Sequence, residues 1–124
     1  NINIVEHYDD SIPKIRAFPG ELNQVWTNLI DNAIDAMEVN NKGNLEITSK
    51  HDTRFVKVYI KDDGPGIPKE IQENIFAPFF TTKEMGKGSG LGLDVVSRIM
   101  LQHNGSVKVK SEPGATEFEI CLPI

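Results

Sequence analysis

Residues 21–36 read ELNQVWTNLIDNAIDA and carry an apolar stripe with the 3.6-residue period of an α-helix. The stripe consists of Leu22, Val25, Trp26, Leu29, Ile30 and Ala33, and it continues to Met37. Pro19-Gly20 breaks the chain before the stripe, and the polar loop 40–43, which ends in glycine, follows it. The sequence therefore predicts a long helix with one face on a core.

Strand-like segments lie on both sides of this helix. The predicted strands are 2–8, 45–49, 55–61, 107–110 and 116–122, with a shorter extended piece at 14–18. The segment 55–61 alternates apolar and polar residues, as expected of a strand with one buried face. The last two strands are expected to form a hairpin around Glu112-Pro113-Gly114.

Two further helices are predicted, a short one at 69–75 and a longer one that begins at Leu91 and ends before Asn104-Gly105. The glycine-rich segment 76–90 between them has no periodicity, and such loops are usually functional. Hairpins with helices between them predict one domain over residues 1–124, an α/β two-layer sandwich. A mixed, mainly antiparallel sheet of about five strands would be covered on one face by about three helices.

Composition excludes several classes of protein. The 124 residues are 39% hydrophobic and 25% charged, with a net charge of −5 at pH 7 and no basic cluster, which argues against nucleic-acid or membrane-surface binding. The single cysteine, Cys121, excludes an internal disulfide, and no apolar run is long enough to span a membrane. The chain starts without methionine inside a strand-like pattern, so we expect a fragment of a longer protein.

The polar face of the first helix carries Asn28 and Asn32, which are four residues apart and so lie on one side of the helix. Their amides can offer oxygen to a metal ion and N–H groups to phosphate. Asparagine is a mediocre helix former, so two in mid-helix need a reason. The alternative is a solvated face that tolerates asparagine.

A second candidate, Asp62-x-Gly64-x-Gly66, follows a predicted strand directly. An aspartate at a strand end can accept a hydrogen bond from a ligand, and the glycines allow backbone to approach a flat ring. The alternative is an ordinary turn.

A third candidate is GKGSGLGL, residues 86–93, which leads into the second long helix. Glycine-rich backbone before a helix N-terminus suits an anion such as phosphate. The P-loop pattern fails because residue 88 is glycine, and the dinucleotide fingerprint fails because Gly90 is followed three residues later by Leu93. The alternative is a flexible linker.

Together these segments resemble the catalytic ATP-binding domain of bacterial two-component sensor histidine kinases, in the superfamily shared with DNA gyrase, Hsp90 and MutL. The segments that carry the resemblance are 21–36 (N box), 62–66 (G1 box), IFAPFFTTK at 75–83 (F box), GSGLGL at 88–93 (G2 box) and, more weakly, GATEF at 114–118 (G3 segment). The resemblance covers essentially the whole chain and implies the Bergerat-type ATP-binding fold.

The resemblance implies roles around the phosphates of ATP. Asn32 would be the protein ligand of Mg²⁺, and Asn28 would contact phosphate and take part in catalysis. The segment 76–90 would be the ATP lid, with Lys83 or Lys87 near the γ-phosphate as further catalytic residues. The G2 residues that would bind phosphate are Gly88, Ser89, Gly90, Leu91 and Gly92.

At the base, the resemblance implies that Asp62 accepts a hydrogen bond from the adenine amino group. Gly64 and Gly66 would lie against the ring, and Thr116 would support the same end. Two positions depart from family patterns. Asp35 stands where many histidine kinases have a basic residue, and Asn28 stands where the ATPase branch has a water-activating glutamate. An amide cannot act as a base, so the second departure favours a kinase.

None of His7, His51 and His103 lies in an acceptor motif, and each is expected to be structural or at the surface. The resemblance therefore implies a monomeric domain. Its partner would be the histidine-bearing dimerisation domain of the same kinase, which is absent from this chain. A response regulator would be an indirect partner. The domain would be cytoplasmic, even in a membrane-anchored parent protein, and would not phosphorylate itself. Two alternatives are an anti-sigma-factor-type serine kinase and a degenerate sensor that binds ATP without phosphotransfer.

Overall fold

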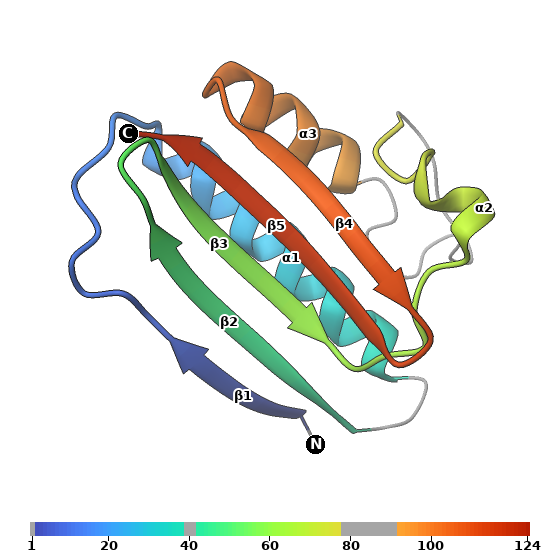
Figure 1. Cartoon of the computed structure of the whole chain (residues 1–124). Coiled ribbons are helices and arrows are strands. Elements are labelled where there is room, and N and C mark those ends of the chain that lie inside the picture. The colour runs from blue at the N-terminus through green and yellow to red at the C-terminus, as the bar shows by residue number, and fades with distance from the viewer. Residues whose placement is uncertain (1, 39–41, 78–91) are drawn as a thin grey trace.

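The computed structural model describes residues 2–38, 42–77 and 92–124. The elements in chain order are β1 (Ile2–His7), α1 (Pro19–Glu38), β2 (Gly43–His51), β3 (Phe55–Asp62), α2 (Lys69–Gln72), α3 (Gly92–Gln102), β4 (Ser106–Glu112) and β5 (Ala115–Pro123). The strands form one sheet in the order β1-β2-β3-β5-β4, in which β1 and β2 are parallel and the other pairs antiparallel (Figure 1). The predicted five-stranded, mainly antiparallel sheet is confirmed.

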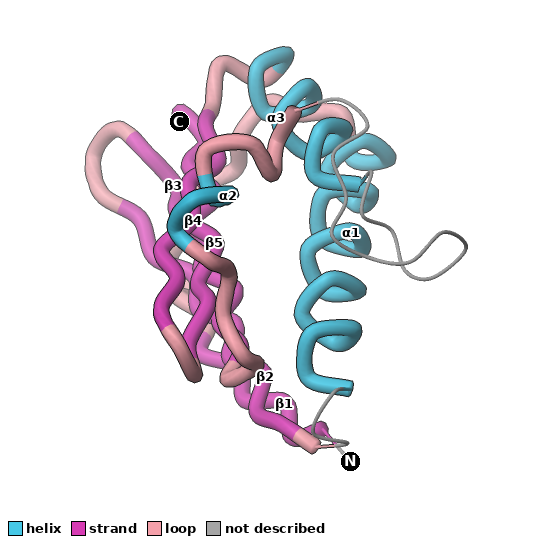
Figure 2. The backbone as a smooth tube through the Cα atoms, turned by 90° about the vertical axis from the view of Figure 1, so that its right-hand side faces the viewer, coloured by secondary structure: helices cyan, strands magenta, loops and turns pink. Residues whose placement is uncertain are grey.

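The helices α1 and α3 form a second layer against one face of the sheet (Figure 2). The short helix α2 lies beside the edge strand β4. The core between the layers contains the predicted stripe of α1, namely Leu22, Val25, Leu29, Ala33 and Met37. Alternate residues of β3 and β5, such as Ile60 and Phe118, complete it from the sheet. The two-layer α/β sandwich is therefore confirmed.

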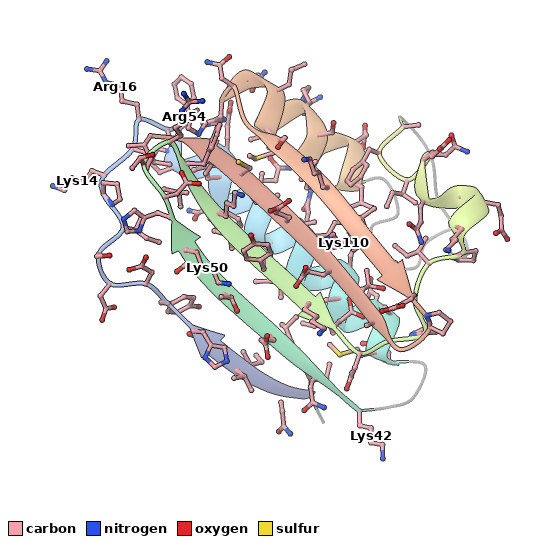
Figure 3. The ribbon with its side chains drawn as sticks, in the orientation of Figure 1. Lys14, Arg16, Lys42, Lys50, Arg54 and Lys110 are labelled. Atoms are coloured by element: carbon pink, nitrogen blue, oxygen red, sulfur yellow. The ribbon has the colours of Figure 1, made fainter. Side chains whose placement is uncertain are left out.

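No helix of the described part of the chain covers the other face of the sheet, and this face is charged. Glu46, Lys61, Glu117 and Lys110 are neighbours in register across four strands, with charges that alternate in sign. Opposite charges on neighbouring strands stabilise a sheet modestly. Lys50 and Lys110 lie on this face, toward the viewer in Figure 3. We conclude that this face is solvated and that the buried polar groups belong to the helical side.

Some boundaries differ from the sequence prediction. Helix α1 begins at Pro19 instead of after Gly20, because proline fits the first turn of a helix, where its missing N–H is not needed. The extended piece at 14–18 belongs to no strand of the described sheet. Strand β4 continues to Glu112, whereas the sequence pattern ended it at Lys110. Helix α2 ends at Gln72 and not at Ile75.

His103 has the structural role expected of it. The ring is buried, its Nδ1 lies 2.8 Å from the Ile99 carbonyl oxygen, and its Nε2 lies 3.0 Å from the Phe18 N–H. Since a backbone N–H can only donate, Nε2 accepts and Nδ1–H donates, which is the neutral form of histidine. His103 therefore joins the end of α3 to the segment before α1.

No helix of the described residues is long and apolar enough to cross a membrane.

Candidate functional site

The polar face of α1 lies toward the start of α3. Asn28, Asn32 and Ala36 are spaced four residues apart, so they follow one another along one side of α1, and all three are half-buried. The Asn28 side chain donates from Nδ2 to the Gly92 carbonyl oxygen at 3.0 Å. Asn28 therefore links the two long helices at the residue where α3 begins.

Asp62 and Thr116 form a buried polar pair at the ends of β3 and β5. The two residues are register partners, and their exposed fractions are only 3% and 4%. Period-two alternation along β3 places Asp62 on the same face as Ile60, toward the helices. A carboxyl group and a hydroxyl group are thus held side by side at the edge of the apolar core.

The Asp62 carboxyl accepts a hydrogen bond at Oδ1 from the Gly64 N–H at 2.9 Å. Burial nevertheless raises the pKa of Asp62 to about 6, although the Gly64 hydrogen bond opposes that shift and Asp63 adds to it. Among the described residues, the Gly64 N–H is the hydrogen-bond partner found for this carboxyl, and the bond is made to Oδ1 and not to Oδ2. A buried carboxylate with one oxygen available is suited to accept a hydrogen bond from a ligand.

The neighbouring Asp63 behaves differently. It is exposed, and its two oxygens accept hydrogen bonds at 2.9 Å from the backbone N–H and the side-chain amide of Asn44. These hydrogen bonds lower the pKa of Asp63. Asp63 therefore joins β3 to the start of β2, and Asp62 alone faces the interior.

The loop after Asp62 approaches its neighbours closely at both glycines. A Cβ added at Gly64 would lie 3.2 Å from the Ala36 Cβ of α1. Gly66 has a φ of +90°, and a Cβ there would lie 2.5 Å from the Glu112 carbonyl oxygen. Only glycine fits at Gly66 without strain. The loop is thereby held between the polar face of α1 and the β4–β5 turn.

Ser111 connects this loop to Thr116. The Ser111 Oγ accepts a hydrogen bond from the Ile67 N–H at 2.7 Å and lies 2.8 Å from the Thr116 Oγ1. The Gln72 amide donates to the carbonyl oxygens of Ile67 at 2.8 Å and Ser111 at 3.2 Å. The loop after β3, helix α2 and strand β5 thus all contact one serine of β4.

A groove of about 1080 Å³ lies beside the edge strand β4. Its lining comes from residues 65–70, from Gln72 and from residues 109–113, which include Ser111. Asp62 and Thr116 are not among the lining residues. The buried pair is therefore a separate feature from this groove.

A metal ion in this region would have few protein ligands. The described residues contain no group of three or more His, Cys, Asp or Glu side chains that could hold one. The Asn32 amide oxygen on α1 remains a candidate ligand. One amide ligand fits Mg²⁺, which usually keeps several waters and binds to substrate phosphates.

The structure thus brings together part of the predicted site. Asp62, Gly64, Gly66 and Thr116 converge at the end of the sheet, and the asparagine face of α1 lies next to them at Ala36. Gly92 is buried and begins α3. The predictions for Lys83, Lys87, Gly88, Ser89, Gly90 and Leu91 concern residues outside the described part of the chain.

Sequence reasoning missed Ser111 and Gln72. The signal for Ser111 was present, because a two-residue turn at Pro113-Gly114 pairs residue 111 with residue 116. Ending the predicted strand at Lys110 concealed that pairing. Gln72 had no signal, since its role depends on where α2 lies against β4.

Phe76 is the described member of the aromatic residues in the F box. Its ring packs edge-on against Phe118, with ring centres 6.2 Å apart. Such T-shaped contacts are favourable in protein cores. Phe76 is thus attached to the core of the domain, whereas Phe79 and Phe80 lie outside the described residues.

Comparison with families gives one match over most of the chain. The model described as "Histidine kinase-, DNA gyrase B-, and HSP90-like ATPase" matches residues 19–124. The sensory histidine kinase/phosphatase NtrB of Rhodobacter capsulatus is 38% identical over 134 residues, which covers 98% of this chain and 37% of NtrB. The chain therefore spans little more than a third of the length of this relative.

Solved structures show the same fold. The nucleotide-free catalytic domain of the histidine kinase ThkA is similar with a TM-score of 0.85 and 34% identity, over 98% of this chain and 80% of that one. Full-length ShkA in complex with AMPPNP is similar with a TM-score of 0.83 and 31% identity, and the match covers 98% of this chain and 25% of that one. ThkA in complex with the response regulator protein TrrA is similar with a TM-score of 0.80 and 32% identity, and the match covers 98% of this chain and 34% of that one.

Proposed function

Because the chain belongs to the histidine kinase-, DNA gyrase B- and HSP90-like ATPase family, we propose that it binds Mg-ATP and donates the γ-phosphoryl group to a histidine of a separate dimerisation domain. The observation that carries this proposal is the buried Asp62–Thr116 pair, which lies where the glycine loop meets the asparagine face of α1. The similar structure of ShkA with AMPPNP, an analogue of ATP, supports the choice of nucleotide.

The base would bind at Asp62. A carboxylate accepts a hydrogen bond from the 6-amino group of adenine, whereas the carbonyl oxygen of guanine at that position would be repelled. Gly64 and Gly66 would lie against the ring, as the family resemblance implies, and their lack of a Cβ lets the loop pack closely on Ala36 and on the Glu112 carbonyl oxygen. Thr116 would contact the same edge of the base as Asp62.

The phosphates would bind between α1 and the start of α3. Asn32 would hold Mg²⁺ through its amide oxygen, and the ion would neutralise charge on the phosphates. One N–H of the Asn28 amide donates to the Gly92 carbonyl oxygen, and the second would donate to a phosphate oxygen. Lys83, Lys87 and the backbone of 88–92 would complete the phosphate site, as the family resemblance implies.

A kinase fits this chain better than an ATPase. Asn28 occupies the position at which the ATPase branch has its glutamate, and an amide cannot remove a proton from water. The chain would therefore contribute positioning and charge neutralisation to phosphoryl transfer. We infer that its partners are the dimerisation domain of the same kinase and, indirectly, a response regulator, as the complex of ThkA with TrrA supports. Because the proposed activity requires ATP, we expect this domain to lie in the cytoplasm.

Incubation with γ-labelled ATP tests the proposal. The purified chain is incubated alone and together with the dimerisation domain of its parent kinase. We expect label on the histidine of that domain only when both are present, with slow phosphate release by the chain alone. Rapid labelling of the chain itself, or fast phosphate release, would contradict the proposal.

A further inference from the structure

Ser111 lies at the junction between the glycine loop and the buried pair. Its hydroxyl contacts the Ile67 N–H at 2.7 Å and the Thr116 hydroxyl at 2.8 Å. The first distance is short for an N–H···O hydrogen bond, and the second is typical of an O–H···O hydrogen bond, so the serine oxygen has two close partners. Ser111 shares the helical side of the sheet with Thr116, because the two residues are register partners in β4 and β5.

The direction of the first hydrogen bond follows from what each group can donate. The Ile67 N–H can only donate, so it occupies a lone pair of the Ser111 Oγ. By geometry alone, either hydroxyl of the Ser111–Thr116 pair could be the donor. In the direction that continues from the Ile67 N–H, Ser111 donates to the Thr116 Oγ1 and the Thr116 proton points elsewhere. All donors in such a chain point the same way, which strengthens each bond.

We propose that Ser111 is a positioning residue that turns the Thr116 hydroxyl into a hydrogen-bond donor toward the purine ring, beside the Asp62 carboxylate that accepts. This inference rests on the proposed ATP-binding function, because it concerns how the same site reads the base. Ser111 itself does not contact the nucleotide. It acts through the Thr116 hydroxyl and through the loop that it holds at Ile67.

An acceptor beside a donor matches adenine and opposes the alternatives. Adenine offers its 6-amino group as a donor and its ring N1 as an acceptor along one edge. Guanine and hypoxanthine offer a carbonyl oxygen and an N1–H there, the reverse arrangement. Asp62 alone distinguishes the group at position 6, whereas an oriented Thr116 adds discrimination at N1, directly or through one water.

Gln72 supports the arrangement from α2. Its amide donates to the carbonyl oxygens of Ile67 and Ser111, so one side chain joins the loop to β4. This keeps the Ile67 N–H directed at the Ser111 Oγ. Because both accepting atoms are backbone carbonyl oxygens, Gln72 holds the loop against the strand.

The experiment compares ATP with ITP, whose hypoxanthine base reverses both groups along this edge. Binding of each nucleotide with Mg²⁺ is measured by competition for wild type, Ser111→Ala and Ser111→Thr. Ser106→Ala is the matched control, since Ser106 lies in the same strand but is exposed on the charged face. Ser111→Cys, with a similar size and a weak donor, replaces Ser111→Ala if that variant does not fold.

We expect Ser111→Ala to lower the ratio of ATP to ITP affinity by about 2- to 10-fold, the effect of one neutral hydrogen bond, and Ser111→Cys to lower it in the same direction. Ser111→Thr and Ser106→Ala should retain the wild-type ratio. In a Thr116→Val background, Ser111→Ala should cause little further change in the ratio, because the two hydroxyls act as one unit.

The outcomes separate the two claims. A wild-type chain that does not bind ATP would overturn the proposed function. A wild-type chain that prefers ATP, together with a Ser111→Ala variant that keeps the wild-type ratio, would overturn only the role of Ser111. A lower unfolding free energy with an unchanged ratio would likewise show that Ser111 is merely structural.

Discussion

The side-chain amide of Asn28 donates to the carbonyl oxygen of Gly92 at 3.0 Å, across 64 residues of sequence. The bond joins α1, which carries Asn28 and Asn32, to α3, which follows the segment 78–91. A residue expected to contact phosphate thus also has a structural task. The first prediction concerns how these two tasks can be separated.

Asn28→Ala should lower the unfolding free energy by about 1 kcal/mol relative to Asn23→Ala, because it removes the hydrogen bond to Gly92. Asn23 is exposed on the same helix, so both variants gain the same helix propensity and only one loses the bond. Urea unfolding of the two variants measures the difference. Equal stabilities would show that this hydrogen bond contributes nothing.

Asn32→Ala should remove most of the effect of Mg²⁺ on ATP affinity while the chain stays folded. The reason is that the amide oxygen of Asn32 would be the one protein ligand of the ion. Calorimetric titration with ATP, in Mg²⁺ and in EDTA, measures the effect, with Asn23→Ala as control. If Mg²⁺ strengthens ATP binding equally in wild type and Asn32→Ala, another residue holds the ion.

The raised pKa of Asp62 predicts that stability depends on pH. Its folded pKa of about 6 lies above the ordinary value of 3.8, so the folded state binds the proton more tightly. The corresponding stability is present below the ordinary pKa and is lost as pH rises through about 6. Since one pKa unit corresponds to about 1.4 kcal/mol, the ionised carboxyl costs at most about 3 kcal/mol at neutral pH.

Asp62→Asn should therefore stabilise the nucleotide-free chain near neutral pH, because the amide keeps the Gly64 contact and carries no charge. The gain over wild type should shrink as pH falls toward about 4. Urea unfolding at several pH values measures both trends. A variant less stable than wild type at every pH would show that the Asp62 charge does not oppose folding.

Gly66→Ala should destabilise the chain more than Gly114→Ala. Both glycines have positive φ, 90° and 86°, so both substitutions bring backbone strain of about 1–2 kcal/mol. A Cβ at Gly114 meets nothing within 4 Å, whereas one at Gly66 meets the Glu112 carbonyl. Thermal unfolding compares them, and ATP affinity should fall only for Gly66→Ala. Equal losses of stability would indicate that the Glu112 contact relaxes freely.

Much of the fold could be predicted because periodicity reports burial directly. The stripe of α1 becomes the core face, and the alternation of β3 places Asp62 inside without any contact being known. Where the prediction was wrong, the cause was local. Pro19 was interpreted as a break before the helix, although it lies in the first turn of α1. Ser111 is polar and was left out of the predicted strand, although it belongs to β4.

The site was less predictable than the fold because it depends on distant contacts. Motifs identified Asp62, Gly64, Gly66 and Thr116 separately, and only strand register makes Asp62 and Thr116 neighbours. Gln72 could not be found, since nothing in its surroundings along the chain indicates that it meets Ser111. The roles of Lys83 and Lys87 stay predictions, because both lie outside the described residues.

The most direct test of the account is the affinity of the wild-type chain for ATP and for GTP, measured side by side in Mg²⁺. If the Asp62 carboxylate reads the adenine amino group, ATP should bind roughly 10- to 150-fold more tightly, the effect of one buried charge-assisted hydrogen bond. Asp62→Ala should lose most of that preference. Equal affinity of the wild-type chain for ATP and GTP would contradict the central claim that this buried carboxylate recognises adenine.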